Sequence, residues 1–163
     1  FYVTYLRLVK GIPPEVGRSL LTVMFGAGVP AFWIAGRLAD RLPFVPFLMT
    51  LLVGVVAGFV ALTQSTGVIA LVLVSLWLGF LVHSMFPAID TYLLSTLPDD
   101  NRASAYSAYS ATMMLVQSGG SSAVGSLTEA GIPFDSVFIG FALVLCLVIV
   151  VISGLYRAGR LPG

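Results

Sequence analysis

The chain has 163 residues, of which 58% are hydrophobic and only 9% are charged. Its mean hydropathy is +1.04, whereas soluble domains are only about 45–50% apolar. Eight basic and seven acidic residues are too few to cover the surface of a soluble domain of this length, so lipid is expected around much of the chain. The net charge of +1 gives no support for nucleic-acid binding, and a single cysteine excludes an internal disulfide framework.

Five apolar segments are long enough to cross a bilayer as helices, because a hydrocarbon core of about 30 Å needs roughly 20 residues. They cover residues 19–35, 44–62, 68–97, 103–127 and 133–155. Residues 1–9 look like the end of a preceding helix, so we expect the chain to be part of something longer. The sequence therefore predicts an all-α polytopic membrane helix bundle, with five complete transmembrane helices plus the tail of a sixth, as one membrane domain over residues 1–163.

Glycines and a proline mark the first two segments as places where helices pack closely. Gly26, Gly28 and Pro30 should thin and bend the first segment. Gly54 and Gly58 form a GxxxG pair in the second segment, and such pairs allow two helix backbones to approach each other in membranes.

The turn between these two segments, residues 36–41, reads Gly-Arg-Leu-Ala-Asp-Arg and carries three charges in six residues. The short connectors force neighbouring helices to run antiparallel, so this turn, the 98–102 turn and the C-terminal tail share one side. That side carries Arg37, Arg41, Arg102, Arg157 and Arg160, against Lys10 and Arg18 on the other. The arginine bias predicts an integral protein of the cell membrane with a cytoplasmic C-terminus.

The third segment is unusually long and holds two ionisable residues, His83 and Asp90. Thirty residues give a helix of about 45 Å, so we expect tilting, protrusion or a kink at Pro87. His83 and Asp90 are seven residues apart and should share one helix face. His83 is either a neutral histidine hydrogen-bonded inside the bundle or a group that binds solute or carries protons.

Asp90 needs a partner, because a bare carboxylate about 10 Å inside the helix end is costly. Arg37 or Arg41 lies at about the right depth, so an ion pair that holds or gates the structure is favoured over a substrate-binding carboxylate.

The fourth segment is small and polar in its middle, from Gln117 to Ser122. This stretch either packs closely on another helix or lines a wet cavity.

The G-x-L-A-D-R pattern, made by Gly36, Leu38, Ala39, Asp40 and Arg41, resembles the loop signature of the major facilitator superfamily. In that family the signature joins the second and third helices of each six-helix half. Pro98-x-x-x-Arg102 before a small-residue helix resembles the turn between the fourth and fifth helices. The pattern departs from the family after Arg41, where Leu42-Pro43 replaces a glycine and further basic residues, as in second halves. The resemblance covers essentially the whole chain.

The resemblance implies the C-terminal half of a secondary transporter that moves a small solute by alternating access, with proton coupling as one option. Partners would be the lipid bilayer, the solute and the missing N-terminal half, without nucleic acid. A non-transporting membrane scaffold or a subunit of a membrane complex is the alternative. No enzyme constellation, cofactor motif or metal site is found. The implied cytoplasmic latch comprises Gly36, Arg37, Asp40, Arg41, Asp90 and Arg102, and the candidates for lining the cavity or for coupling are His83, Gln117, Ser118 and Ser121.

Overall fold

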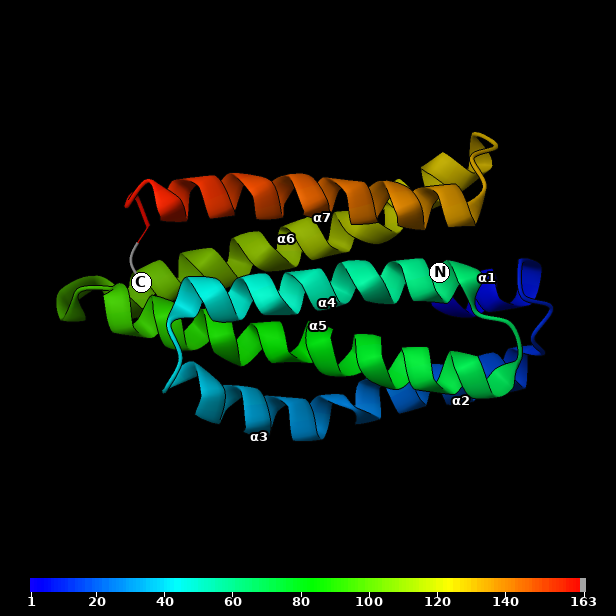
Figure 1. Cartoon of the computed structure of the whole chain (residues 1–163), viewed down its shortest axis with the longest axis horizontal. Coiled ribbons are helices and arrows are strands. Elements are labelled where there is room, and N and C mark those ends of the chain that lie inside the picture. Colours follow the sequence, from blue (N-terminus) through cyan, green and yellow to red (C-terminus); the bar gives the residue numbers. More distant parts are fainter. Residues whose placement is uncertain (162–163) are drawn as a thin grey trace.

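A computed structural model describes residues 1–161, and these fold into helices joined by short turns (Figure 1). The elements are α1 (Tyr2–Leu8), α2 (Pro14–Gly26), α3 (Gly28–Ala39), α4 (Phe44–Gln64), α5 (Val68–Thr96), the short 3₁₀ helix η1 (Asp99–Asn101), α6 (Arg102–Glu129) and α7 (Phe134–Arg157). The predicted all-α bundle is confirmed.

Prolines and glycines set where these helices begin. A proline stands immediately before each of four helical elements, at Pro13, Pro43, Pro98 and Pro133. Proline has a fixed φ and no N–H, so it can precede a helix but cannot continue one that comes before it. Gly67 precedes α5 with φ of 80°, a conformation that costs glycine little. The turns are therefore encoded locally, close to where the sequence predicted them.

The long helices lie side by side and alternate in direction (Figure 1). One end of the molecule holds the α3–α4 turn, the α5–α6 turn and residues 158–161. This end carries the five arginines named above, and we call it the arginine-rich end. The opposite end holds the α1–α2, α4–α5 and α6–α7 turns. The antiparallel arrangement predicted from connector length is confirmed.

The predicted number of complete membrane spans needs a correction. Within residues 1–161, four segments are both long enough and apolar enough to cross a membrane: Pro14–Ala39, Phe44–Gln64, Val68–Thr96 and Phe134–Arg157. The first of them is α2 and α3 together. The fifth, α6, is 28 residues long but is not among them, because its glycines, serines and Gln117 lower its hydropathy.

The bend predicted in the first segment is confirmed. The helix breaks at Ala27, between α2 and α3. Pro30 has no N–H and cannot donate to the carbonyl of Gly26 four residues earlier. Both pieces pack against α5, where a Cβ added to Gly79 would lie 2.0 Å from the carbonyl oxygen of Met24. The backbones of α2 and α5 therefore touch at a position that only glycine allows.

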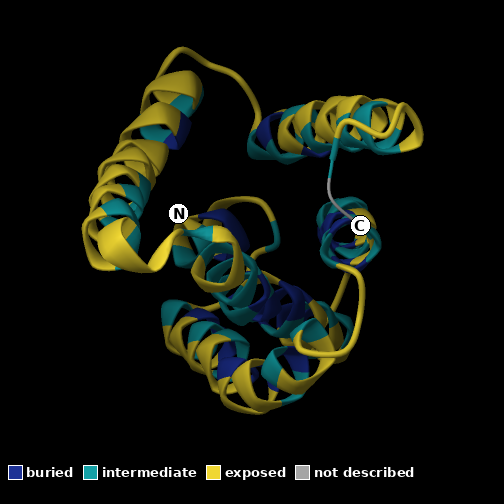
Figure 2. Cartoon of the chain, turned by 90° about the vertical axis from the view of Figure 1, so that its left-hand side faces the viewer, coloured by how far each residue is buried: buried dark blue, intermediate teal, exposed yellow. Residues whose placement is uncertain are grey.

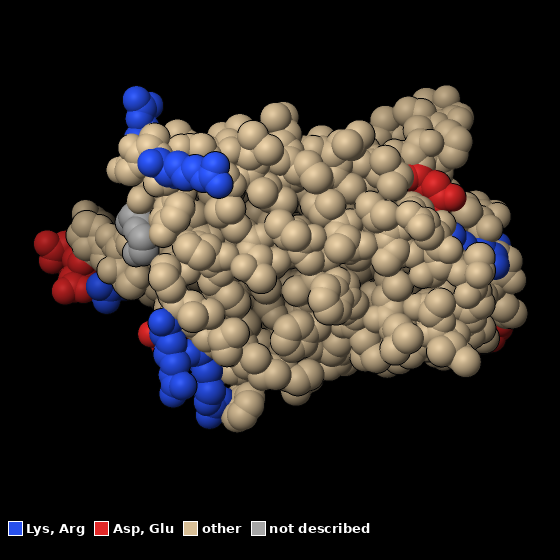
Figure 3. Space-filling view, in the orientation of Figure 1, with Lys and Arg blue, Asp and Glu red and all other residues tan. Residues whose placement is uncertain are grey.

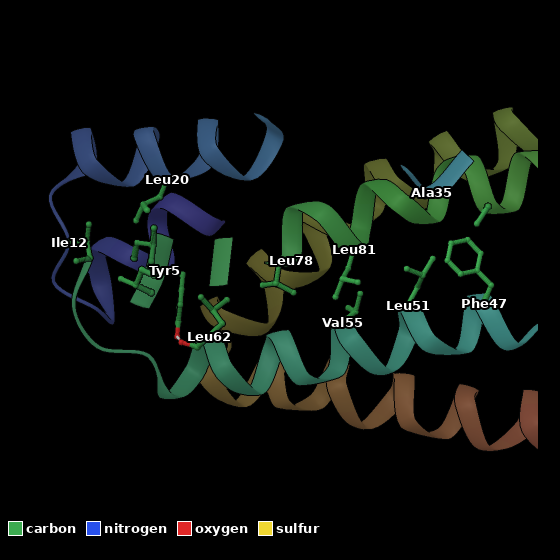
Figure 4. Packing of buried hydrophobic residues seen from close by; sticks show 13 residues of the cluster. Tyr5, Ile12, Leu20, Ala35, Phe47, Leu51, Val55, Leu62, Leu78 and Leu81 are labelled. Carbon is green, nitrogen blue, oxygen red and sulfur yellow. Dashed lines mark hydrogen bonds between the residues drawn. The ribbon is translucent and has the colours of Figure 1, made fainter. Parts of the chain in front are cut away.

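The core lies mainly between α4 and α5 (Figure 4). Leu51 and Val55 of α4 face Leu81 of α5, and a Cβ on Gly54 would come within 2.6 Å of the Leu81 side chain. A Cβ on Gly58 would come within 2.4 Å of Leu78. The predicted GxxxG contact is therefore confirmed, with leucines of α5 filling the grooves that the two glycines leave.

Helix α6 stands apart from this core (Figure 2). Its residues are exposed along most of its length, and Val124 is its buried residue. Buried residues gather instead on the helices in the middle of the bundle. A crevice consequently opens between α6 and α5.

Candidate transport site

The imidazole of His83 lies where α2 and α3 meet α5. Its ring centroid is 5.6 Å from that of Phe25 and 6.2 Å from that of Phe32, on α2 and α3. Phe86, one turn further along α5, lies 6.3 Å away. A Cβ on Gly28 would come within 2.7 Å of the imidazole, so the lack of a side chain at Gly28 makes the room that His83 occupies.

One ring nitrogen of His83 has a hydrogen-bond partner, and the other has none among residues 1–161. Nδ1 lies 2.7 Å from the carbonyl oxygen of Gly79, and a carbonyl only accepts, so Nδ1 carries the hydrogen. In the neutral ring Nε2 is then a free acceptor, and no partner for it occurs within residues 1–161. Pro87 also has no N–H to donate to the His83 carbonyl four residues earlier. The site therefore combines the unpaired Nε2 of His83 with the His83 carbonyl oxygen, which receives no hydrogen bond from residue 87.

The crevice between α5 and α6 has a volume of about 260 Å³, and its lining includes Val82 and Phe86 on either side of His83 in the sequence but not His83 itself. Each helix contributes a stripe of side chains at helical spacing. The α5 stripe is Val82, Met85, Phe86 and Ile89, and the α6 stripe is Tyr109, Met113 and Gln117. Two of these side chains, Tyr109 and Gln117, bring hydrogen-bonding groups to an otherwise apolar wall. The wall can hold a small solute at mid-membrane depth.

The other two polar candidates on α6, Ser118 and Ser121, do not line this crevice. Both are exposed, and the Ser118 hydroxyl donates to the Leu115 carbonyl at 2.8 Å. No heavy atom of another element lies within 4 Å of a Cβ added to Gly119 or Gly120. Within this part of the chain, the small polar stretch of α6 therefore faces outward from the bundle.

The structure does not bring Asp90 together with Arg37 or Arg41. Within residues 1–161 the ion pair that forms is Arg102 with Asp99, at 2.6 Å. The Asp90 carboxylate lies instead beside the phenols of Tyr106 and Tyr109 on α6. The Arg37 guanidinium lies over the Trp33 ring, 3.7 Å from its centroid. Asp90 therefore faces α6, while Arg37 folds back along α3 onto Trp33.

The remaining latch candidates lie at the arginine-rich end. Asp40 and Arg41 are exposed beyond α3, and a Cβ on Gly36 would meet nothing within 4 Å. Arg102 opens α6 and donates to the Leu97 carbonyl at 3.3 Å, so it ties the start of α6 to the end of α5. The charged groups among them share this end of the molecule, and we call them the charged rim.

Comparison with known proteins decides the family. Residues 2–162 match the family model of the Major Facilitator Superfamily. The chain belongs to the Major Facilitator Superfamily. No curated protein and no solved structure matches it. Members of this superfamily are transporters rather than enzymes, so the chain is an integral membrane protein of secondary solute transport.

A second polar cluster, which the sequence did not predict, lies at the end of the molecule opposite the arginine-rich end. The Tyr5 side chain is fully buried, and its hydroxyl donates to Asp135 Oδ1 at 2.7 Å. The Lys10 ammonium donates to the Thr63 carbonyl at 2.6 Å and lies 5.6 Å from the Tyr5 ring centroid. The feature of the sequence that could have indicated this cluster is Asp135, an acidic residue without a basic residue nearby in the sequence. This cluster fastens α1 to α4 and α7.

Proposed function

We propose that this chain is the C-terminal six-helix half of a transporter that moves a small solute across the cell membrane by alternating access. The missing N-terminal half would close the open side of the crevice, and the C-terminus would be cytoplasmic. The observation that supports this most directly is the crevice itself. It lies between α5 and a helix, α6, whose small polar face has no partner among residues 1–161.

In this proposal the charged rim is a latch that closes the arginine-rich end in one of two conformations. Gly36, Arg37, Asp40, Arg41, Asp90 and Arg102 form the set. Asp90 pairs with Arg41 or Arg37 when the protein is open to the outside, and faces the α6 tyrosines when it is not. A charge that exchanges partners biases a two-state element by the difference between its two environments.

His83 is the candidate for proton coupling, because it offers a titratable nitrogen beside the crevice. The rings of Phe25, Phe32 and Phe86 lie around this imidazole, with centroid separations of 5.6, 6.2 and 6.3 Å. Gln117 provides the hydrogen-bonding group that would orient a solute in the crevice. Ser118 and Ser121 would contribute from the side that the N-terminal half covers.

The experiment uses the full-length protein in proteoliposomes. A counterflow screen with a broad set of metabolites identifies a solute, and its accumulation is then driven by a pH gradient. His83→Ala should reduce gradient-driven accumulation to the level of protein-free liposomes while solute exchange persists, because exchange needs no net proton transfer.

Ser84→Ala is the matched control, since the Ser84 hydroxyl donates only within its own helix, to the Phe80 carbonyl, and should leave both activities intact. Unchanged gradient-driven uptake in His83→Ala would remove the coupling role. A protein that moves no solute at all would favour the scaffold alternative.

A further inference from the structure

Two apolar hollows flank the first turns of α4, near the arginine-rich end. One, of about 350 Å³, lies toward α7 and is lined by Pro46, Met49, Thr50, Val53 and Tyr156. The other, of about 250 Å³, lies toward α3 and includes Leu38, Leu42 and Phe47. Pro46 and Thr50 line both hollows, so they form the ridge between them.

The face that carries these hollows is suited to lipid rather than to another protein helix. α4 and α7 have the highest mean hydropathies of the four membrane-crossing segments, 2.5 and 3.0. Helix–helix contacts within membranes use glycine, serine and other small residues. Thr50 is the one small residue in the linings of the two hollows, which otherwise consist of large aliphatic and aromatic side chains and prolines.

Positive charge stands on both flanks of the same region (Figure 3). Arg157 ends α7 and Arg160 follows it, next to Tyr156 in the first hollow. Arg41 follows α3 on the other flank, beside Asp40. All three arginines are exposed, and none forms an ion pair within residues 1–161. No acidic residue lines either hollow.

We propose that the two hollows on α4 hold the acyl chains of one anionic phospholipid whose headgroup is bound by Arg157 and Arg160. The guanidinium fork matches the oxygens of a phosphate. The ridge of Pro46 and Thr50 separates the two chains. Tyr156 lies at the level of the headgroup, where aromatic rings of membrane proteins concentrate. The site lies on the outer face of α4, away from the α5–α6 crevice.

The test measures lipid retention by the full-length protein with native mass spectrometry, in titrations with phosphatidylglycerol and phosphatidylcholine. The wild-type protein should retain phosphatidylglycerol more tightly. The double variant Arg157→Gln/Arg160→Gln should bind it about 25-fold more weakly, since one basic residue near an anionic membrane surface contributes about five-fold in affinity. Arg18→Gln, on the opposite end, should bind like the wild type.

A second variant tests the hollows separately from the charges. Thr50→Trp places a large side chain on the ridge, where it fills the hollows on either side, and should weaken retention of both lipids. Val144→Trp, at an exposed position of α7, should not. Inorganic phosphate should weaken phosphatidylglycerol retention only in part, because the acyl chains carry the rest of the affinity. Equal retention of the two lipids by the wild type overturns the proposal. So does an unchanged preference in the arginine double variant, or full competition by phosphate.

Discussion

His83 and Asp90 show what residue spacing determines and what it leaves open. Their separation of seven residues places them on one face of α5, as the sequence predicted. Their surroundings nevertheless differ, since α2 and α3 cover His83 and α6 covers Asp90. Residue spacing determines which side chains share a face of a helix, but the arrangement of the neighbouring helices determines what those side chains contact. The Asp90–arginine pair, expected from depth and from the family resemblance, does not form among residues 1–161 of this structure, and depth does not specify which group lies beside a carboxylate.

The latch proposal makes a prediction about charge exchange at Asp90. Asp90→Arg and Arg41→Asp should each abolish transport by the full-length protein, because each leaves two like charges opposed in the latched conformation. The double variant Asp90→Arg/Arg41→Asp should recover a substantial part of the uptake rate, since the attraction is restored with reversed signs. Uptake into proteoliposomes is the measurement.

Asp100→Asn is the control for that experiment. Asp100 is exposed at the same end of the molecule and forms no ion pair within residues 1–161, so transport should be unaffected. Should the double variant be as inactive as the single ones, Asp90 and Arg41 do not act as a pair.

Among the elements, the sequence predicted best where helices begin and end. The predicted segments 44–62, 68–97 and 133–155 correspond to Phe44–Gln64, Val68–Thr96 and Phe134–Arg157, because prolines and glycines stop helices by local chemistry. The status of α6 was harder to predict. Its length fits a membrane span, but its small and polar composition suits a helix that packs against protein on one side. Sequence periodicity does not reveal which protein surface that side would contact.

The contact between α2 and α5 predicts a large effect for a single methyl group. Gly79→Ala would place its Cβ 2.0 Å from the Met24 carbonyl oxygen, and backbone cannot move aside as a side-chain end can. The helices must separate, so the free energy of unfolding should fall by about 1–3 kcal/mol. The midpoint of thermal unfolding in detergent, followed by circular dichroism, should therefore drop by several degrees.

Gly140→Ala provides the comparison on α7, where an added Cβ meets nothing within 4 Å. Alanine favours the helix over glycine by roughly 1 kcal/mol, so this variant should unfold at or slightly above the wild-type temperature. A Gly79→Ala protein that matched Gly140→Ala would show that α2 and α5 do not touch at this point.

At the scale of the whole molecule, composition predicted the fold class and connector length predicted the antiparallel order. Contacts between distant parts of the chain were not predictable. Tyr5 and Asp135 are 130 positions apart, and neither carries a local pattern that names the other. Such a contact depends on how α1, α4 and α7 converge, which one sequence read by helical period and hydropathy does not determine.

The Tyr5 contact predicts how much the bundle depends on α1. Tyr5→Phe removes the hydroxyl that donates to Asp135 and lies 3.3 Å from the Leu62 carbonyl oxygen, while it keeps the ring against Phe138. A buried hydrogen bond to a charged group contributes about 1.5–3 kcal/mol. The variant should therefore unfold at a clearly lower temperature than the wild type.

A double-mutant cycle separates this hydrogen bond from general damage to the core. If the hydroxyl acts through Asp135, Tyr5→Phe should cost much less stability in an Asp135→Ala background than in the wild type. Tyr92→Phe is the matched control, because its ring stacks on Phe44 and its hydroxyl makes no hydrogen bond within residues 1–161. Equal losses in both backgrounds would mean that Tyr5 stabilises the bundle through its ring alone. Coupling between the two residues would instead show that a polar contact at the end opposite the arginine-rich end holds α1, α4 and α7 together.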